Sequence, residues 1–212
     1  MITIIDYKAG NLASVQKALT HLGYESIITE DAAAVAAAER LLLPGVGNFV
    51  ATERLNERGL TAAIRDAIAR GVPFMGICVG MQWLFEGSTE APGTKGLGLF
   101  PGMVERFRTE SPAWPGLKVP HVGWNTLDTG APSKLLAGLE PGSFVYFTHS
   151  YRAPLVDGTV AMTTYGERFS AAVERGNVFG TQFHPEKSSH AGLRMLKNFC
   201  EYVPAGGKGL SC

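Results

Sequence analysis

The sequence is short of cysteine, has no excess of charge of either sign and contains no long apolar run. Its three cysteines, Cys78, Cys200 and Cys212, are too few and too scattered along 212 residues for a disulfide framework or a zinc site. Its 19 basic and 19 acidic residues cancel, and no basic segment creates a local field that would attract nucleic acid or an anionic membrane. No apolar segment approaches the ~18 residues that a membrane-spanning helix needs. We therefore expect no nucleic-acid or membrane partner, no metal, and a reducing cytoplasm as the compartment.

The amino terminus and the composition indicate a globular domain. Residues 1–6 carry no basic region ahead of their apolar residues, and Asp6 interrupts them, so they predict a first strand rather than a signal peptide. Hydrophobic residues make up 45% and charged residues 18%, which is an ordinary balance for a chain that buries a core. Because no repeat or linker divides the sequence, we expect one domain over residues 1–203 and a flexible, glycine-rich tail over residues 204–212.

Strand and helix patterns alternate in the first half of the chain. Apolar or β-branched segments that predict strands are separated by segments with helical periodicity, which argues for a parallel sheet with helices on both faces. The expected strands are 2–6, 25–29, 40–43 and 73–78, and the expected helices are 12–22, an alanine-rich segment after Asp31, 49–58 and 60–70.

Short strands dominate the second half. Turns between them make hairpins the expected connection, so this half should add antiparallel strands on the same sheet or beside it. The expected strands are 102–107, 143–147, 159–165, 169–174 and 178–183, and a last amphipathic helix over 189–202 carries Cys200 on its inner face as part of the core. The predicted fold class is α/β, a doubly wound and mostly parallel sheet with added antiparallel strands.

The segment around Cys78 has the pattern of a nucleophile elbow. Gly76 and Gly80 lie two residues to either side of the cysteine, between an apolar run and a helix-compatible run. Such a sharp strand-to-helix turn exposes one side chain above a sheet, and it needs glycine where a Cβ would strike the neighbouring strand or helix. The alternative is a buried structural cysteine between two turn-forming glycines, and the motif alone favours neither.

A nucleophilic cysteine needs a base and a group that orients the base. His184 follows a predicted strand, and Pro185 biases its backbone away from helical geometry, which places Glu186 close enough to accept a hydrogen bond from one ring nitrogen. The alternative is that Glu186 only caps the helix that follows.

An acyl-transfer site also needs hydrogen-bond donors where the oxyanion develops. The backbone N–H of Val79 directly follows the nucleophile. The segment Gly45-Val46-Gly47, at the end of the neighbouring strand, suits a second donor at Val46 or Gly47, since glycine lets a peptide plane turn without steric penalty. The loops 6–11 and 44–48 and Cys78 all follow predicted strands, so they should share one rim of the sheet.

These segments resemble the class I, triad-type glutamine amidotransferases. The signature pair is Gly76-Ile-Cys-Val-Gly-Met-Gln82 with His184-Pro-Glu186. Within that class, five blocks resemble the family of glutaminase subunits of imidazole glycerol-phosphate synthase, in family order from the first strand to the last helix: Asp6–Leu12, Pro44–Phe49, Val119–Asn125, Phe147–Tyr151 and His184–Ser188. Val79 departs from the leucine common in the family, but the group needed there is the backbone N–H.

The resemblance implies hydrolysis of L-glutamine to glutamate and ammonia through a thioester on Cys78, without a cofactor. The ammonia would pass through a tunnel to a cyclase subunit, which makes imidazole glycerol phosphate in histidine biosynthesis. It further implies that Gln82, His149, Ser150 and Tyr151 hold the glutamine, and that the partner-facing residues are Asn11, His121, Trp124, Asn125 and Lys187.

Alternatives stay open at two of these residues and for the function. The alternative for His149 is a structural, hydrogen-bonded role. The alternative for Trp124 is a place in the core, although an aromatic between glycine and asparagine is poorly placed for a strand interior. Rival functions are a stand-alone cysteine hydrolase, another class I glutaminase subunit, and an inactive subunit that only binds a partner. The intact set Cys78, His184 and Glu186 argues against the inactive subunit.

Overall fold

The computed structural model describes residues 1–111 and 114–204, and its core is a seven-stranded sheet. The strand order is β12-β13-β14-β4-β3-β1-β2, in which β2, β1, β3, β4 and β14 are parallel and β13 and β12 are antiparallel additions at one edge. This confirms the predicted fold class. Residues 205–212 of the predicted tail, with Cys212, lie outside the described residues.

The first half supplies four parallel strands and most of the helices. Strands β1, β3 and β4 are buried along their whole length, since helices cover both faces, and this is why they appear in the sequence as uninterrupted apolar runs. The elements are β1 (Ile2–Ile5), α1 (Leu12–His21), β2 (Ser26–Thr29), α2 (Ala32–Ala36), β3 (Leu41–Gly45), the 3-10 turn η1 (Phe49–Thr52), α3 (Glu53–Glu57), α4 (Leu60–Ala69), β4 (Phe74–Cys78) and α5 (Val79–Gln82).

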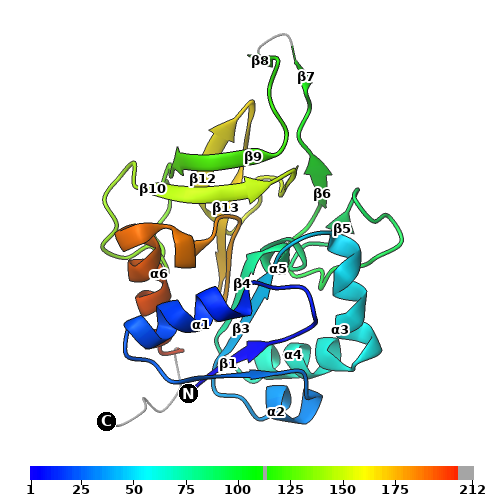
Figure 1. Cartoon of the computed structure of the whole chain (residues 1–212), viewed down its shortest axis with the longest axis vertical. Coiled ribbons are helices and arrows are strands. Elements are labelled where there is room, and N and C mark those ends of the chain that lie inside the picture. Colours follow the sequence, from blue (N-terminus) through cyan, green and yellow to red (C-terminus); the bar gives the residue numbers. More distant parts are fainter. Residues whose placement is uncertain (112–113, 205–212) are drawn as a thin grey trace.

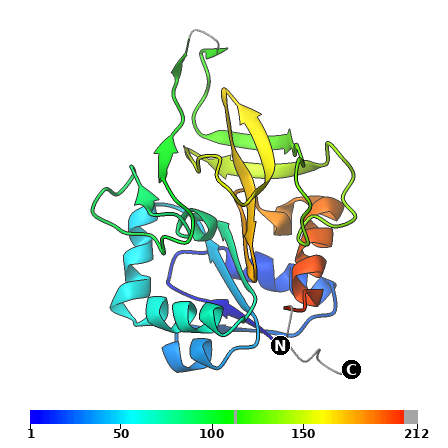
Figure 2. The ribbon, with the colours of Figure 1, turned by 180° about the vertical axis from the view of Figure 1, so that it is seen from behind.

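Helices lie on both faces of the sheet. Figure 1 shows α1 and the last helix, α6, on one face, and the view from behind in Figure 2 brings α2, α3 and α4 to the front. Asp31 caps α2, because its carboxylate accepts the backbone N–H of Ala33 at 3.0 Å. Asn11 precedes α1 but makes no side-chain capping bond, and the helix expected over 49–58 is divided between η1 and α3.

The second half adds antiparallel strands both on the central sheet and beside it. A pair of strands, β9 and β10, packs above the carboxyl ends of the parallel strands (Figure 1). The elements are β5 (Gly87–Ser88), β6 (Met103–Arg106), β7 (Glu110–Ser111), β8 (Trp114–Pro115), β9 (His121–Thr126), β10 (Phe144–His149), β11 (Tyr151–Arg152), β12 (Thr159–Tyr165), β13 (Glu167–Arg175), β14 (Val178–Thr181), the 3-10 turn η2 (Pro185–Lys187) and α6 (Ser189–Glu201).

Strand β9 was not among the strands expected from the sequence. Trp124 lies in its interior and pairs with Tyr146 of β10, although an aromatic between glycine and asparagine is unfavourable for a strand. Among the described residues the strand β9 pairs with β10 alone, and this two-stranded pairing tolerates glycine and asparagine at alternate positions.

The described residues contain no helix long and apolar enough to cross a membrane. Cys200 lies on the buried face of α6, and burial raises the pKa of its thiol to about 12, so it is a packing residue as expected.

Candidate active site

Cys78 ends β4 in the strained backbone conformation of a nucleophile elbow. Its φ of 55° and ψ of −109° are unusual for a residue with a side chain. A Cβ on Gly76 would lie 2.3 Å from the carbonyl oxygen of Gly80, and one on Gly80 would lie 2.0 Å from that of Leu43. The two glycines therefore permit α5 to pack directly on β4 and β3, and the elbow needs both.

His184 and Glu186 form a buried pair. The Nδ1 atom of His184 lies 2.9 Å from Oε1 of Glu186, and both side chains are 1% exposed. Burial alone would lower the pKa of His184, but the sulfur of Cys78 and the carboxylate of Glu186 outweigh it and raise the pKa to about 10. Within the described residues neither Nε2 of His184 nor Oε2 of Glu186 has a hydrogen-bond partner, and no side-chain hydrogen bond caps α6.

Tyr146 of β10 and Ser188, the residue before α6, hold the backbone of His184 in place. The N–H of His184 donates to the carbonyl of Tyr146 at 2.9 Å. The hydroxyl of Ser188 donates to the carbonyl of His184 at 2.6 Å and accepts the N–H of Tyr146 at 2.9 Å. Three hydrogen bonds therefore fix the turn from which the imidazole reaches Cys78.

A pocket of about 280 Å³ brings the predicted residues together at the carboxyl ends of the parallel strands. It is lined by Cys78 and His184, by the segments predicted to hold substrate and oxyanion, and by three residues that sequence reasoning did not single out. The lining is Val46, Gly47, Cys78, Val79, Gln82, Glu90, Pro120, Thr148, His149, Ser150, Tyr151 and His184. A second groove, of about 470 Å³, lies against α6 and residues 138–143 and contains none of them.

His149 has the surroundings of a structural histidine, although it lines the pocket. Its Nδ1 lies 2.8 Å from the carbonyl oxygen of Tyr151, so Nδ1 carries the proton, and its Nε2 lies 3.1 Å from Nδ1 of His121. Burial lowers the pKa of His149 to about 3, helped by the neighbouring His121 and His184, and lowers that of His121 to about 4. Both rings are therefore neutral near pH 7, and both nitrogens of His149 are already hydrogen bonded.

The segment predicted to complete the oxyanion hole does not direct the Val46 donor into the pocket. The N–H of Val46 donates to the carbonyl of Ala9 at 3.3 Å, and Gly47 has a φ of 91°. Gly45 lies beside Cys78 in the sheet register, and a Cβ there would lie 2.3 Å from the hydroxyl of Tyr7. The loop is thus close to Cys78, but the N–H of Val46 is bonded to the carbonyl of Ala9.

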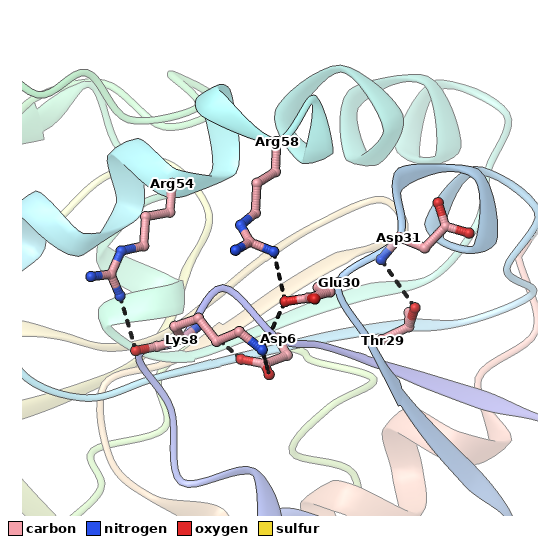
Figure 3. Close-up of polar contacts among 7 residues, drawn as sticks. All are labelled: Asp6, Lys8, Thr29, Glu30, Asp31, Arg54 and Arg58. Carbon is pink, nitrogen blue, oxygen red and sulfur yellow. Dashed lines mark hydrogen bonds and ion pairs between the residues drawn. The ribbon is translucent and has the colours of Figure 1, made fainter.

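A polar network holds the loop that carries Ala9. Lys8, at a φ of 65°, pairs with Asp6 at 3.0 Å and with Glu30 at 2.7 Å, and Arg58 pairs with the same Glu30 at 2.6 Å (Figure 3). Arg54 donates to the carbonyl of Lys8 at 3.2 Å. These contacts reach from β2 and α3 to the residue that precedes Ala9.

The predicted partner-facing residues divide into exposed and buried ones. Trp124 is 52% exposed and packs its ring 6.1 Å from that of Tyr146, over which the Nζ of Lys187 lies at 5.8 Å. The expectation for His121 is wrong as regards its side chain, which is 3% exposed because it stacks between Phe147 and Tyr165.

Asn125 and Asn11 are both half-buried. The amide of Asn125 turns inward, where it donates to the carbonyl of Thr164 at 3.1 Å and lies 3.4 Å from Nε2 of His121. Asn11 precedes α1, which contacts the turn η2 that carries Lys187. Lys187 and Trp124 are thus linked through the ring of Tyr146, and α1 packs beside the turn that carries Lys187.

Sequence reasoning missed Gln182 and Tyr7. Gln182 is fully buried, and its Nε2 lies 3.7 Å from Sγ of Cys78. The buried hydroxyl of Tyr7 has no partner in the described part of the chain, and burial and the charge of Cys78 raise its pKa well above the ordinary value. No signal in the sequence marks either residue, since Gln182 comes near Cys78 through the pairing of β14 with β4 and the Tyr7 hydroxyl lies beside Gly45, which is far away in the sequence.

Comparisons with known proteins place the chain in a family. Residues 3–203 match the model of the family Glutamine amidotransferase class-I. Over 209 residues the chain is 49% identical to the imidazole glycerol phosphate synthase subunit HisH of Moorella thermoacetica, covering 97% of each chain. Over 202 residues it is 50% identical to the protein of the same name in Rhodopirellula baltica, covering 94% of this chain and 96% of the relative.

Solved structures agree on the fold. A crystal structure described as a glutamine amidotransferase superposes with a TM-score of 0.72 at 21% identity, covering 95% of this chain and 98% of the other. A chain of PurLQS from Thermotoga maritima superposes with a TM-score of 0.71 at 21% identity, covering 95% and 97%. With the elbow and the His184–Glu186 pair at the expected rim, the chain belongs to the class I glutamine amidotransferases and, among them, to the family of the HisH subunits of imidazole glycerol phosphate synthase.

Proposed function

We propose that Cys78, His184 and Glu186 hydrolyse L-glutamine to glutamate and ammonia, and that the ammonia passes to a separate cyclase subunit that makes imidazole glycerol phosphate. The observation that carries this proposal is His184, which is bonded to Glu186 and lines one pocket with a cysteine held at an elbow. The match to the HisH family over nearly the whole chain supports the substrate and the partner.

The chemistry follows from the arrangement of the three groups. The sulfur of Cys78 attacks the side-chain amide carbon of glutamine, and His184, through Nε2, transfers a proton to the departing ammonia. With its pKa raised to about 10, His184 favours the imidazolium form at neutral pH, which suits this acid step. The neutral imidazole then takes a proton from the water that attacks the thioester, while Glu186 holds the ring through Nδ1.

The reaction forms two tetrahedral intermediates, one before ammonia leaves and one before glutamate leaves. The oxyanion of each intermediate needs hydrogen-bond donors. Val79 lines the pocket directly after the nucleophile and supplies one backbone N–H. We assign the second to the Val46–Gly47 segment, whose peptide has to rotate because the Val46 N–H is bonded to Ala9. Binding of the cyclase subunit is the event proposed to favour the rotated arrangement.

Glutamine binding and partner binding are assigned to separate surfaces. Gln82, Ser150 and Tyr151 line the pocket beside Cys78 and are proposed to hold the amino and carboxylate groups of glutamine, with His149 supporting Tyr151. Trp124, Lys187 and Asn11 are proposed to face the cyclase, with Asn125 and His121 packed behind Trp124.

Ammonia release from glutamine tests the proposal. It is measured on the chain alone, with a cyclase subunit, and with the cyclase and its nucleotide ligand. We expect low activity alone, a large rise in the complex, and incorporation of the ammonia into the cyclase product. Robust activity of the isolated chain that the partner leaves unchanged would instead indicate a stand-alone cysteine hydrolase.

A further inference from the structure

Gln182 lies beside the nucleophile although it is not part of the triad. It directly follows β14, which pairs in parallel with β4 so that Thr181 lies opposite Ile77. The residue after Thr181 is Gln182, and the residue after Ile77 is Cys78. The side chain of Gln182 is 0% exposed, and its Nε2 lies 3.7 Å from Sγ of Cys78. The pairing register of β14 with β4 therefore makes Gln182 and Cys78 neighbours.

The orientation of the Gln182 amide follows from its partners. The Nε2 of Gln82 lies 3.1 Å from the carbonyl oxygen of Tyr151 and 3.1 Å from Oε1 of Gln182. A backbone carbonyl can only accept, so the nitrogen of Gln82 has to face Tyr151. Its second hydrogen then requires an acceptor, which is the oxygen of Gln182. The nitrogen of Gln182 is thereby turned toward the sulfur.

A second donor, from His149, holds the Tyr151 carbonyl that orients the Gln82 amide. Nδ1 of His149 donates to the Tyr151 oxygen at 2.8 Å, and His121 donates through Nδ1 to Nε2 of His149 at 3.1 Å. All four side chains in the series are buried, at 0% for Gln182, 3% for Gln82, 3% for His121 and 6% for His149. In such surroundings a reversed amide would leave two donors facing each other, which is costly.

We propose that Gln182 is a further catalytic residue, whose side-chain N–H donates a hydrogen bond to the sulfur of Cys78 and stabilises its anionic form. This role rests on the proposed glutaminase chemistry. In deacylation, water forms the new C–O bond, the C–S bond breaks, and the electron pair stays on sulfur. A donor beside the sulfur stabilises that leaving group, as it stabilises the attacking thiolate. The amide nitrogen of Gln82 positions Gln182, in addition to the place of Gln82 in the glutamine pocket.

The rate of alkylation of Cys78 by iodoacetamide tests the proposal without needing glutamine turnover. The rate is followed from pH 5 to pH 10 on the peptide that contains Cys78, by mass spectrometry of the full chain after digestion. Gln182→Met keeps the volume and removes the donor, and Gln182→Glu keeps the acceptor for Gln82 but turns an oxygen toward the sulfur. The other titratable groups around the site are unchanged in these variants: Tyr7, Glu90, His149, Tyr151, His184 and Glu186.

Thr181→Val is the matched control. Thr181 is the adjacent residue, is also 0% exposed, and has a buried hydroxyl without a hydrogen-bond partner in the described residues, so its loss removes no donor to Cys78. We expect Gln182→Met to slow alkylation at pH 7 about tenfold, with the midpoint of the pH profile moved up by about one unit, because hydrogen bonds to charged groups have about this strength. Gln182→Glu should slow it further, and Thr181→Val should keep the wild-type rate.

A wild-type alkylation rate in Gln182→Met, with an unchanged thermal unfolding midpoint, would overturn the proposed role of Gln182. An equal loss of alkylation rate in Thr181→Val would also overturn it. If Gln182→Met does not fold, Gln182→Glu decides in the same way, since a folded Gln182→Glu protein with the wild-type alkylation rate also overturns it. A protein whose Cys78 shows the expected dependence on Gln182 but that releases no ammonia from glutamine would contradict the proposed function alone.

Discussion

The two walls of the Cys78 pocket differ in how they are held. On one wall, the glycine elbow fixes Cys78, and the backbone of His184 is bonded to Tyr146 and Ser188 while its ring is bonded to Glu186. On the other wall, Val46 is 37% exposed, Gly47 has no neighbour where a Cβ would lie, and the Val46 N–H is bonded to Ala9. The nucleophile is assembled in this fold, whereas the second oxyanion donor requires a rearrangement.

The largest effect is expected on the assembled wall. Cys78→Ala removes the atom that forms the thioester, so glutamine hydrolysis should fall by at least about ten-thousandfold. Because the thiol lines the pocket, binding of the cyclase subunit and the thermal unfolding midpoint should stay close to wild type. Loss of folding would indicate that the cysteine is a core residue and would remove the basis of the comparison.

Glu186→Gln tests how much the orienting carboxylate contributes. The amide keeps the size of Glu186 but permits the wrong tautomer of His184, so kcat should fall by about a hundredfold or more while KM for glutamine changes little. Steady-state ammonia release in the presence of the cyclase measures both constants. A loss confined to KM would assign Glu186 to substrate binding instead.

Gly47→Ala tests the flexible wall, with Gly45→Ala as its contrast. Alanine disfavours the φ of 91° that Gly47 adopts here, at a cost of about 1–2 kcal/mol. This should raise ammonia release without the partner about fivefold or more and reduce the stimulation by the partner, with little change in KM. At Gly45 the added Cβ would meet the Tyr7 hydroxyl, so that variant should lower the unfolding midpoint. Equal effects of Gly47→Ala on turnover and on glutamine binding would count against a rotating peptide.

The pH dependence of stability should show the charge on His184. Its folded pKa of about 10 lies above the unfolded value of 6.5, so its stabilising contribution is full below pH 6.5 and is lost as the pH rises toward 10. Urea unfolding of wild type and of His184→Gln should therefore give a difference in free energy of unfolding that shrinks between pH 7 and pH 10. A difference that stays constant over this range would mean that His184 is neutral in the resting site.

The smallest effect is expected from the polar network behind Ala9. Glu30→Gln weakens the pairs with Lys8 and Arg58, and all three side chains are exposed by 40–48%. Since exposed ion pairs are weak, we expect the partner-free rate to rise by less than about threefold, and only at low salt. A rise larger than that of Gly47→Ala would place the control of the loop in this network.

The parallel strands of the first half and the positions of Cys78, His184 and Glu186 were predictable because their signals are local. Glycines two residues to either side of Cys78, and Pro185 between His184 and Glu186, each specify a turn within a few residues. The alternation of apolar and helical segments specified a parallel sheet, and parallel strands bring their carboxyl ends to one rim.

Other features depend on contacts between distant segments. Gln182 acquires its orientation from Gln82, 100 residues away in the sequence, and the Val46 N–H from the carbonyl of Ala9. The strand that contains Trp124 was missed because it forms by pairing of β9 with β10, and the burial of His121 was missed because the rings of Phe147 and Tyr165 enclose it. No local pattern carries this information.

One measurement tests the difference between the two walls most directly. Alkylation of Cys78 by iodoacetamide and release of ammonia from glutamine are followed in parallel, on the chain alone and in complex with the cyclase subunit and its nucleotide ligand. If the nucleophile is already assembled and only the oxyanion donor changes, the complex should raise ammonia release by at least about a hundredfold. The alkylation rate of Cys78 should stay within about twofold, once the shielding of Cys78 by a saturating partner alone has been subtracted. Alkylation that rises in proportion to ammonia release would show that the partner assembles the nucleophile and would contradict this account.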